Sequence, residues 1–79
     1  MNGIHPDLLK QMKEYYRPGM RVMLIRMRDP YTNLRWGDRG TVTCVDDVGT
    51  IHVVWDRGSS LGVAFGEDEC RKIEENDHE

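Results

Sequence analysis

The sequence predicts a mainly β fold, a small five-stranded antiparallel barrel with a short N-terminal α-helix. Between residues 37 and 62, short β-type stretches are separated by Asp/Gly turn signals at near-regular intervals. Valine, threonine, isoleucine and tryptophan fill these stretches, which suits a pleated, half-buried surface. The first connection, residues 28–40, is long and the later ones are tight. These features together indicate a strongly curved sheet.

Residues 1–19 are expected to form the N-terminal helix and the turn that ends it. Pro6 suits a first helical turn, and Asp7 places negative charge where the helix dipole favours it, so the helix is predicted over 5–16. A helix this short is marginal alone in water, so it must dock on the barrel, on a second copy or on a partner. Its apolar stripe, with spacings of three and four, is Leu8, Leu9, Met12, Tyr15 and Tyr16.

Residues 20–73 are expected to form the barrel. The predicted strands are 20–27, 41–46, 50–55, 60–65 and 70–73. The first strand is apolar on both faces, so Val22 and Leu24 can line the barrel while the Met23 and Ile25 side supports the helix. In the third strand Trp55 shares its face with alternate apolar residues and is predicted to lie in the core.

Composition sets the class of protein. The chain has 79 residues, 38% of them hydrophobic and 32% charged, which indicates one ordinary globular domain. No apolar run approaches the roughly 18 residues of a membrane span, and the N-terminus lacks a signal-peptide pattern, so the expected location is cytoplasmic. Residues 74–79 carry no apolar side chain and are expected to form an acidic disordered tail.

The two cysteines, Cys44 and Cys70, lie far apart and have no CxxC partner. Free thiols are expected, with Cys44 slow to react if it points inward, and neither a metal nor a cofactor is predicted.

The net charge of −3 results from two segments of opposite charge. Residues 17–39 contain six arginines and two aspartates, a net charge of +4. Residues 66–79 contain seven acidic and two basic residues, a net charge of −5.

A string of motifs in residues 17–73 resembles a known family. The motifs include Pro18-Gly19-x-Arg21-Val22, Asp29-Pro30-Tyr31-Thr32, Gly40-Thr41-Val42, Trp55-Asp56-x-Gly58-Ser59-Ser60 and Gly66-Glu67-Asp68-Glu69. They resemble an uncharacterised bacterial and phage-associated family, a domain of unknown function numbered four-three-one-four. That resemblance implies an SH3-like barrel and no established activity. Members usually place proline before the glycine that opens the second strand, whereas this chain has Trp36 before Gly37.

The loop cluster Arg28, Tyr31, Arg35, Trp36 and Arg39 is the candidate ligand-binding site. Guanidinium groups beside aromatic rings can stack bases, grip phosphates or hold an acidic or extended peptide. The alternative is that Tyr31 and Trp36 fold back to cover an open end of the barrel while the arginines are solvated. A small domain needs its large aromatic side chains for burial, which favours that alternative.

No catalytic constellation is predicted, and the protein is not expected to be an enzyme. Asp46, Asp47 and Asp56 lie near turn glycines, where Asx-type hydrogen bonding explains them, and His52 is expected to be an exposed strand residue. The first functional hypothesis is a non-enzymatic SH3-like binding module for a protein or peptide, an accessory protein of a bacterium, phage or mobile element. The alternative is a barrel that binds RNA or single-stranded DNA through the arginine-rich loop, against which the pI near 5.5 counts. Homo-oligomerisation is compatible with either.

Overall fold

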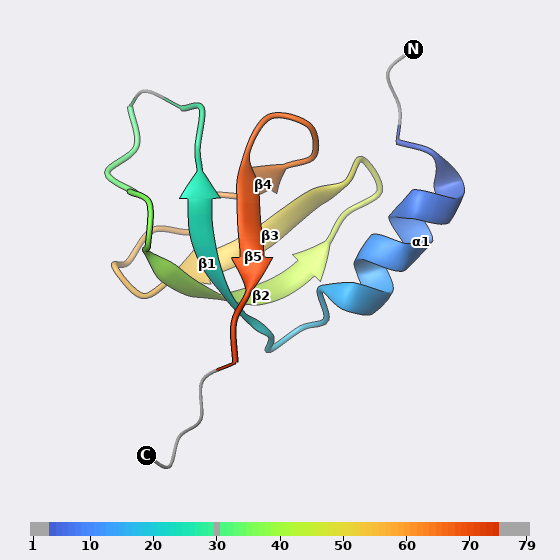
Figure 1. Cartoon of the computed structure of the whole chain (residues 1–79), viewed down its shortest axis with the longest axis horizontal. Helices are drawn as coiled ribbons and strands as arrows, with labels where there is room; N and C mark the ends of the chain where they lie inside the picture. The colour runs from blue at the N-terminus through green and yellow to red at the C-terminus, as the bar shows by residue number, and fades with distance from the viewer. Residues whose placement is uncertain (1–3, 30, 75–79) are drawn as a thin grey trace.

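Five antiparallel strands form one sheet, and one short helix lies beside it in the computed structural model (Figure 1), which describes residues 4–29 and 31–74. The strand order in the sheet is β4-β3-β2-β1-β5. The elements are α1 Pro6–Tyr15, β1 Arg21–Arg26, β2 Arg39–Val45, β3 Thr50–Trp55, β4 Val63–Ala64 and β5 Glu69–Lys72. The mainly β class, the five antiparallel strands and the short helix are confirmed. Within the described residues no pairing joins β4 to β5, so the sheet is not closed.

The helix begins and ends where local chemistry dictates. His5 caps it, since its Nδ1 accepts a hydrogen bond from the backbone N–H of Asp7, and Pro6 occupies the first turn. At the other end the N–H of Tyr16 reaches the carbonyl of Met12 at 2.8 Å. The predicted helix, 5–16, therefore includes both cap residues. Residues 75–79 of the predicted tail lie outside the described part of the chain.

Strand β3 has the predicted bounds, whereas β2 begins two residues earlier than predicted. The added residues are Arg39 and Gly40, and Gly40 is the Cα partner of Trp55. A Cβ on Gly40 would lie 2.5 Å from Val53 Cγ1 and 2.9 Å from the Trp55 ring, so only glycine fits there. Gly40 was expected to end a loop, but it belongs to the sheet because β3 packs directly against it.

The fourth predicted strand, 60–65, is wrong in extent, because β4 has only two residues. The preceding segment is held by bonds outside the regular ladder. The backbone N–H of Trp55 donates to the carbonyl of Ser59 at 2.7 Å, and its indole Nε1–H donates to the carbonyl of Leu61 at 2.8 Å. Both hydrogen bonds are made by Trp55 and lie outside the regular strand pairing. The chain pairs regularly with β3 only from Val63.

Alternate residues of the strands fill the core, as the strand pattern predicts. Val22 and Leu24 are almost fully buried, and Trp55 is 1% exposed, so the predicted core face of β1 and of β3 is confirmed. The buried cluster also includes one residue of the long first loop. Its members are Val22, Leu24, Leu34, Val42, Val45, Ile51, Val53, Trp55, Val63 and Cys70.

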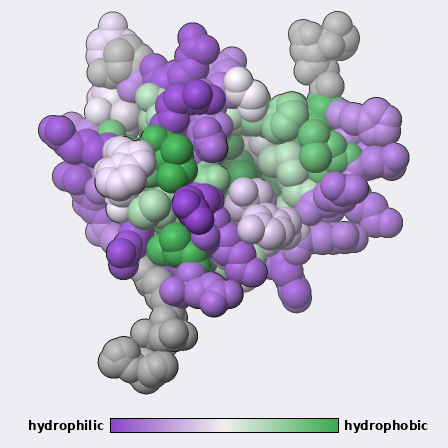
Figure 2. Space-filling model, viewed as in Figure 1, coloured by the Kyte–Doolittle hydropathy of each residue, from purple (hydrophilic) through white to green (hydrophobic). Residues whose placement is uncertain are grey.

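The helix covers a different face of the sheet from the one expected. It packs against the buried cluster through Leu9, Met12 and Tyr16. Met12 and Tyr16 line the hollow beneath the helix together with Ile51 and Cys70, where the sheet is not closed between its outer strands. The Met23 side of β1, which was expected to support the helix, faces away from the core. Apolar surface appears at the helix and also in the region of β1 (Figure 2).

Within the residues described, no helix has the length and apolar character needed to cross a bilayer.

Candidate functional site

The long first loop is a firmly anchored segment. Leu34, its one aliphatic residue, is 6% exposed and belongs to the core cluster. The carbonyl of Leu24 accepts the N–H of Gly37 at 2.8 Å, and the N–H of Leu24 donates to the carbonyl of Asp38 at 2.7 Å. Local side-chain bonds hold the rest: Asp29 Oδ1 accepts the N–H of Tyr31, and Thr32 Oγ1 that of Leu34. The loop is thus preorganised by its own sequence and by the adjoining strand.

An ion pair ties the loop to the connection that follows β3. Arg57 donates to both carboxylate oxygens of Asp38, at 2.9 and 3.0 Å. The same carboxylate accepts the backbone N–H of Arg35 at 2.9 Å. Hydrogen bonds from Arg57, followed by the one from Arg35, hold the pKa of Asp38 below its usual value, and the carboxylate raises the pKa of Arg57 in turn. This pair fixes the distance between two loops that are far apart in sequence.

Both aromatic side chains of the loop face solvent. Tyr31 is 92% exposed and Trp36 is 72% exposed. The interpretation in which these rings cover an open end of the barrel is therefore wrong. Leu34 is the residue of this loop that joins the buried core cluster. The loop displays its aromatic rings and buries the residue between them.

Tyr31 lines an open groove of about 500 Å³ between the first loop and the connection after β3. The loop contributes Asp29, Tyr31, Thr32 and Asn33, and the opposite wall consists of Arg57, Gly58, Ser59 and Leu61. The lining therefore combines an aromatic ring and an aliphatic side chain with charges of both signs. Polar groups around an apolar contact surface are typical of a peptide-binding groove.

The predicted site residues separate into two surfaces. Arg28 lines the adjoining hollow beside Leu61, where its backbone N–H donates to Asp68. Arg35 and Trp36 lie in the turn that Asp38 closes. Asp38 also binds Arg57, and Arg57 lines the Tyr31 groove. Arg39 lies on β2 as the Cα partner of Met23 and lines a separate hollow. Of the five predicted residues, Tyr31 lines the groove between the first loop and the connection after β3; Arg28, Arg35 and Trp36 belong to the same loop, and Arg39 lies apart on β2.

The sequence interpretation missed Leu34 and the pair of Asp38 with Arg57. Leu34 is the one aliphatic residue among breakers and charges in residues 28–40, which is a usable signal for a buried anchor. No sequence signal joins Asp38 to Arg57, since the two residues are 19 positions apart and meet only through the fold.

The aspartates of the turns have structural partners. Asp46 Oδ1 accepts the N–H groups of Val48 and Thr50, which confirms the Asx-type turn, and its Oδ2 lies 2.8 Å from His52 Nε2. The hydrogen bond with His52, followed by that from Thr50, lowers the pKa of Asp46. Asp56 instead binds the guanidinium of Arg21 through two hydrogen bonds, and that contact lowers its pKa. His52 is only partly exposed.

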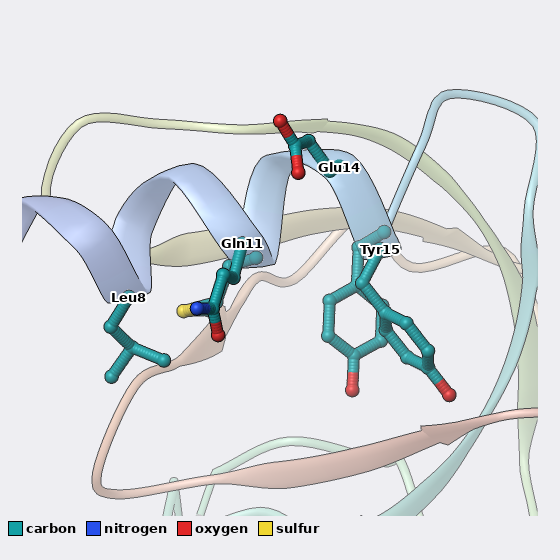
Figure 3. A pocket seen from close by; sticks show the side chains of 6 residues that line it. Leu8, Gln11, Glu14 and Tyr15 are labelled. Atoms are coloured by element: carbon teal, nitrogen blue, oxygen red, sulfur yellow. The ribbon is translucent and has the colours of Figure 1, made fainter.

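A second surface lies along the helix, where an open hollow of about 510 Å³ is formed (Figure 3). Leu8, Gln11 and Tyr15 point to the same side of the helix, and Glu14 points away from them. Tyr15 is 51% exposed, with Lys72 Nζ 5.5 Å from its ring centre. Burial raises the pKa of the neighbouring Tyr16 to about 12. This surface offers apolar contact and one cation–π pair.

Neither cysteine is paired: Cys44 is exposed and Cys70 is buried. Burial raises the pKa of the Cys70 thiol to about 12. Among residues 4–29 and 31–74, no three His, Cys, Asp or Glu side chains lie close enough to hold a metal ion. The described surface offers aromatic faces, guanidinium groups and carboxylates.

One comparison identifies a family. The model of a domain of unknown function, DUF4314, matches residues 5–73. No curated protein and no solved structure matches the chain. The chain belongs to this family of unknown function.

Proposed function

We propose that this member of the DUF4314 family is a non-enzymatic binding module, built on an SH3-like barrel, for a protein or peptide partner. The proposed contact surface is the loop surface, defined as Arg28, Tyr31, Arg35 and Trp36 together with the groove wall at Arg57 and Leu61. Two free thiols suit the reducing cytoplasm, where we expect a small accessory protein of a bacterium, phage or mobile element to work.

One observation carries the proposal: a rigidly anchored loop presents Tyr31 and Trp36 to solvent. A domain of this size gains stability by burying its large aromatic side chains, so leaving two of them exposed gives up apolar burial. The loop is held by Leu34, by Asp38 and by backbone bonds to Leu24, so little conformational entropy is lost when a partner binds. Exposed aromatic residues on a rigid frame are the usual anchors of protein interfaces.

A peptide or protein suits this surface better than a nucleic acid. The carboxylates of Asp29, Asp38 and Asp68 lie among the arginines and would repel a phosphate backbone. A polypeptide presents both signs of charge and can satisfy both. Nucleic-acid binding stays the second candidate, because exposed Tyr31 and Trp36 could also stack on bases.

The test is selection from a displayed peptide library with the full chain as bait, followed by anisotropy measurements with the selected peptides. We expect Tyr31→Ala and Trp36→Ala each to weaken binding at least tenfold. The matched control is Tyr15→Ala, which removes a half-exposed tyrosine on the helix and is expected to change affinity less than twofold. Amide shifts should gather at residues 31–36 and 57–61.

Two results would overturn the proposal. The first is selected peptides that bind Tyr31→Ala and Trp36→Ala as tightly as the parent chain while Tyr15→Ala loses them, which would place the contact on the helix. The second is binding of oligo(dT) or RNA at the same amides, with affinity falling steeply as salt rises and with no peptide selected. That outcome would replace the peptide partner with a nucleic acid.

A further inference from the structure

The side of the sheet that faces away from the core carries a second charged surface. Met23 on β1 is the Cα partner of Arg39 on β2 and of Arg71 on β5, so the three side chains form one row across three strands. Val22 and Leu24, the neighbours of Met23, are buried, so Met23 points to the opposite side. With Ile73, these residues surround a hollow of about 380 Å³. We call Met23, Arg39, Arg71 and Ile73 the outer basic face.

The row has an apolar centre and a positive charge at each end. Arg39 and Arg71 are both exposed. Neighbouring strands lie about 4.8 Å apart, so residues separated by one strand lie about 10 Å from each other. Arg71 makes no ion pair with any residue that the structure describes, whereas Arg39 lies close enough to Asp56 to help lower the pKa of that carboxyl. Two positive charges on either side of one small hollow repel each other, and an anion bound between them lowers the electrostatic energy.

We propose that the outer basic face binds a helical segment of a partner protein that carries two carboxylates seven residues apart and an apolar side chain between them. Residues i and i+7 of a helix share one face and lie about 10.5 Å apart, which matches the spacing of the two arginines. A side chain at i+3 or i+4 then rests on Met23 and Ile73. This proposal uses a different surface from the loop surface and does not depend on it.

The chemistry of the face favours carboxylates over phosphates. Guanidinium groups bind carboxylates through two parallel hydrogen bonds, and Arg21 with Asp56 shows that geometry nearby on the same sheet. Glu74 lines the hollow and would repel a chain of phosphates, and none of the lining residues is aromatic, so none can stack on a base. The apolar floor adds contact area for an amphipathic helix that a nucleic-acid backbone cannot use.

The probe is a 17-residue alanine- and glutamine-based helical peptide with glutamates at positions 5 and 12 and leucines at positions 8 and 9. An isomer of the same composition, with glutamates at positions 5 and 10, places its charges on different faces. Titration of the full chain is followed by amide shifts. We expect shifts at Met23, Arg39 and Arg71, and binding at least fivefold tighter for the first peptide than for the isomer.

Variants assign the contact to the two arginines. Arg39→Gln with Arg71→Gln is expected to weaken binding at least tenfold, and Arg71→Gln alone to weaken it at least threefold. The control Lys10→Gln with Arg17→Gln removes the same charge from exposed positions elsewhere and should change affinity less than twofold. Arg71→Lys keeps the charge without the fork and should fall between the parent and Arg71→Gln. Melting curves check that each variant is folded.

Three results would overturn the inference: no shift on the outer basic face, equal affinity for the two isomers, or equal loss in the control pair. Shifts of the same amides on addition of oligo(dT), with the peptides silent, would make the face a polyanion site instead. Shifts confined to residues 31–36 and 57–61 would assign the peptide to the loop surface. If peptide binding at Tyr31 fails its own test, the proposal for the outer basic face still stands, because the two surfaces are tested separately.

Discussion

The two tryptophans lie in regions that treat the same side chain in opposite ways. Trp55, the last residue of β3, is 1% exposed, and its indole N–H donates to the carbonyl of Leu61. Trp36, in the first loop, is 72% exposed. The sheet surrounds one indole on all sides because strand alternation and the segment 59–62 close over it. The loop is instead anchored through Leu34 and leaves its aromatic side chains outside. The burial of Trp55 thus follows from its position in a strand, whereas the exposure of Trp36 follows from how the loop is anchored to the core.

The largest expected effect comes from truncating each tryptophan in turn. Trp55→Ala should lower the free energy of unfolding by about 3 to 5 kcal/mol, because it empties a core site and leaves the Leu61 carbonyl without its donor. Trp36→Ala should change it by less than about 0.5 kcal/mol, as for an exposed position. Thermal and urea unfolding of both variants measure the difference. Equal destabilisation would break the contrast between the regions.

The anchor of the loop gives the next effect. Leu34→Ala should cost about 2 to 3 kcal/mol, since it removes buried methyl groups from the edge of the core. Tyr31→Ala, three residues earlier in the chain, should be nearly neutral because Tyr31 is exposed. Unfolding curves compare the two variants, and amide exchange of residues 31–38 should rise only in Leu34→Ala. A neutral Leu34→Ala would mean that the loop is held without its apolar anchor.

The pair of Asp38 with Arg57 predicts a smaller, pH-dependent effect. A carboxyl whose pKa is lowered in the folded state contributes stability that is present above its unfolded pKa of about 3.9 and is lost as pH falls through the folded value. Asp38, Asp46 and Asp56 all have lowered pKa values, so the melting temperature should fall as pH decreases below about 4.

Asp38→Asn should be less stable than the parent at neutral pH and should approach it at low pH, where the parent carboxyl is also uncharged. Arg57→Gln should lose a similar amount, and the double variant should lose less than the two single losses combined, because both changes remove one interaction. Additive losses would show that the two side chains act separately, and the loop would then be anchored by Leu34 and its backbone bonds alone.

The smallest effect concerns thiol chemistry. Cys44 is exposed and should be alkylated within the folded protein, whereas Cys70 is buried with a pKa raised to about 12 and should react only on unfolding. Mass spectrometry after timed addition of iodoacetamide at neutral pH distinguishes the two sites. Faster alkylation of Cys70 would mean that the helix does not stay docked over β5.

An inward-pointing Cys44 would react slowly, whereas the exposed Cys44 is expected to react first. The difference comes from a shift in strand register. Counting by twos along β2 places Cys44 on the same face as Val42. The ladder with β3 is irregular between these two residues, so Val45 is buried and Cys44 lies outside opposite His52. A β-bulge changes the face of every later residue, and the strand pattern of a single chain does not reveal where one lies.

The helix shows the same limit at a larger scale. Its bounds and its apolar stripe were predictable, because capping and three-to-four spacing are local properties. The face of the sheet that it covers was not, because β1 is apolar on both sides and offers two docking surfaces. The helix lies nearest to β2. Its Met12 and Tyr16 side chains reach the open side of the sheet, between β4 and β5, because buried Ile51, Val63 and Cys70 would otherwise face water there.

Local periodicity and turn chemistry alone establish the mainly β class, the bounds of β3, the burial of Trp55 and the positions of the charged segments. Those properties depend on neighbours a few residues apart along the chain. The exposure of Tyr31 and Trp36, the separation of Arg39 from them, and the row of Arg39, Met23 and Arg71 depend on contacts between distant segments. Only the folded chain decides these, because register, bulges and the pair of Asp38 with Arg57 arise when strands and loops far apart in sequence meet.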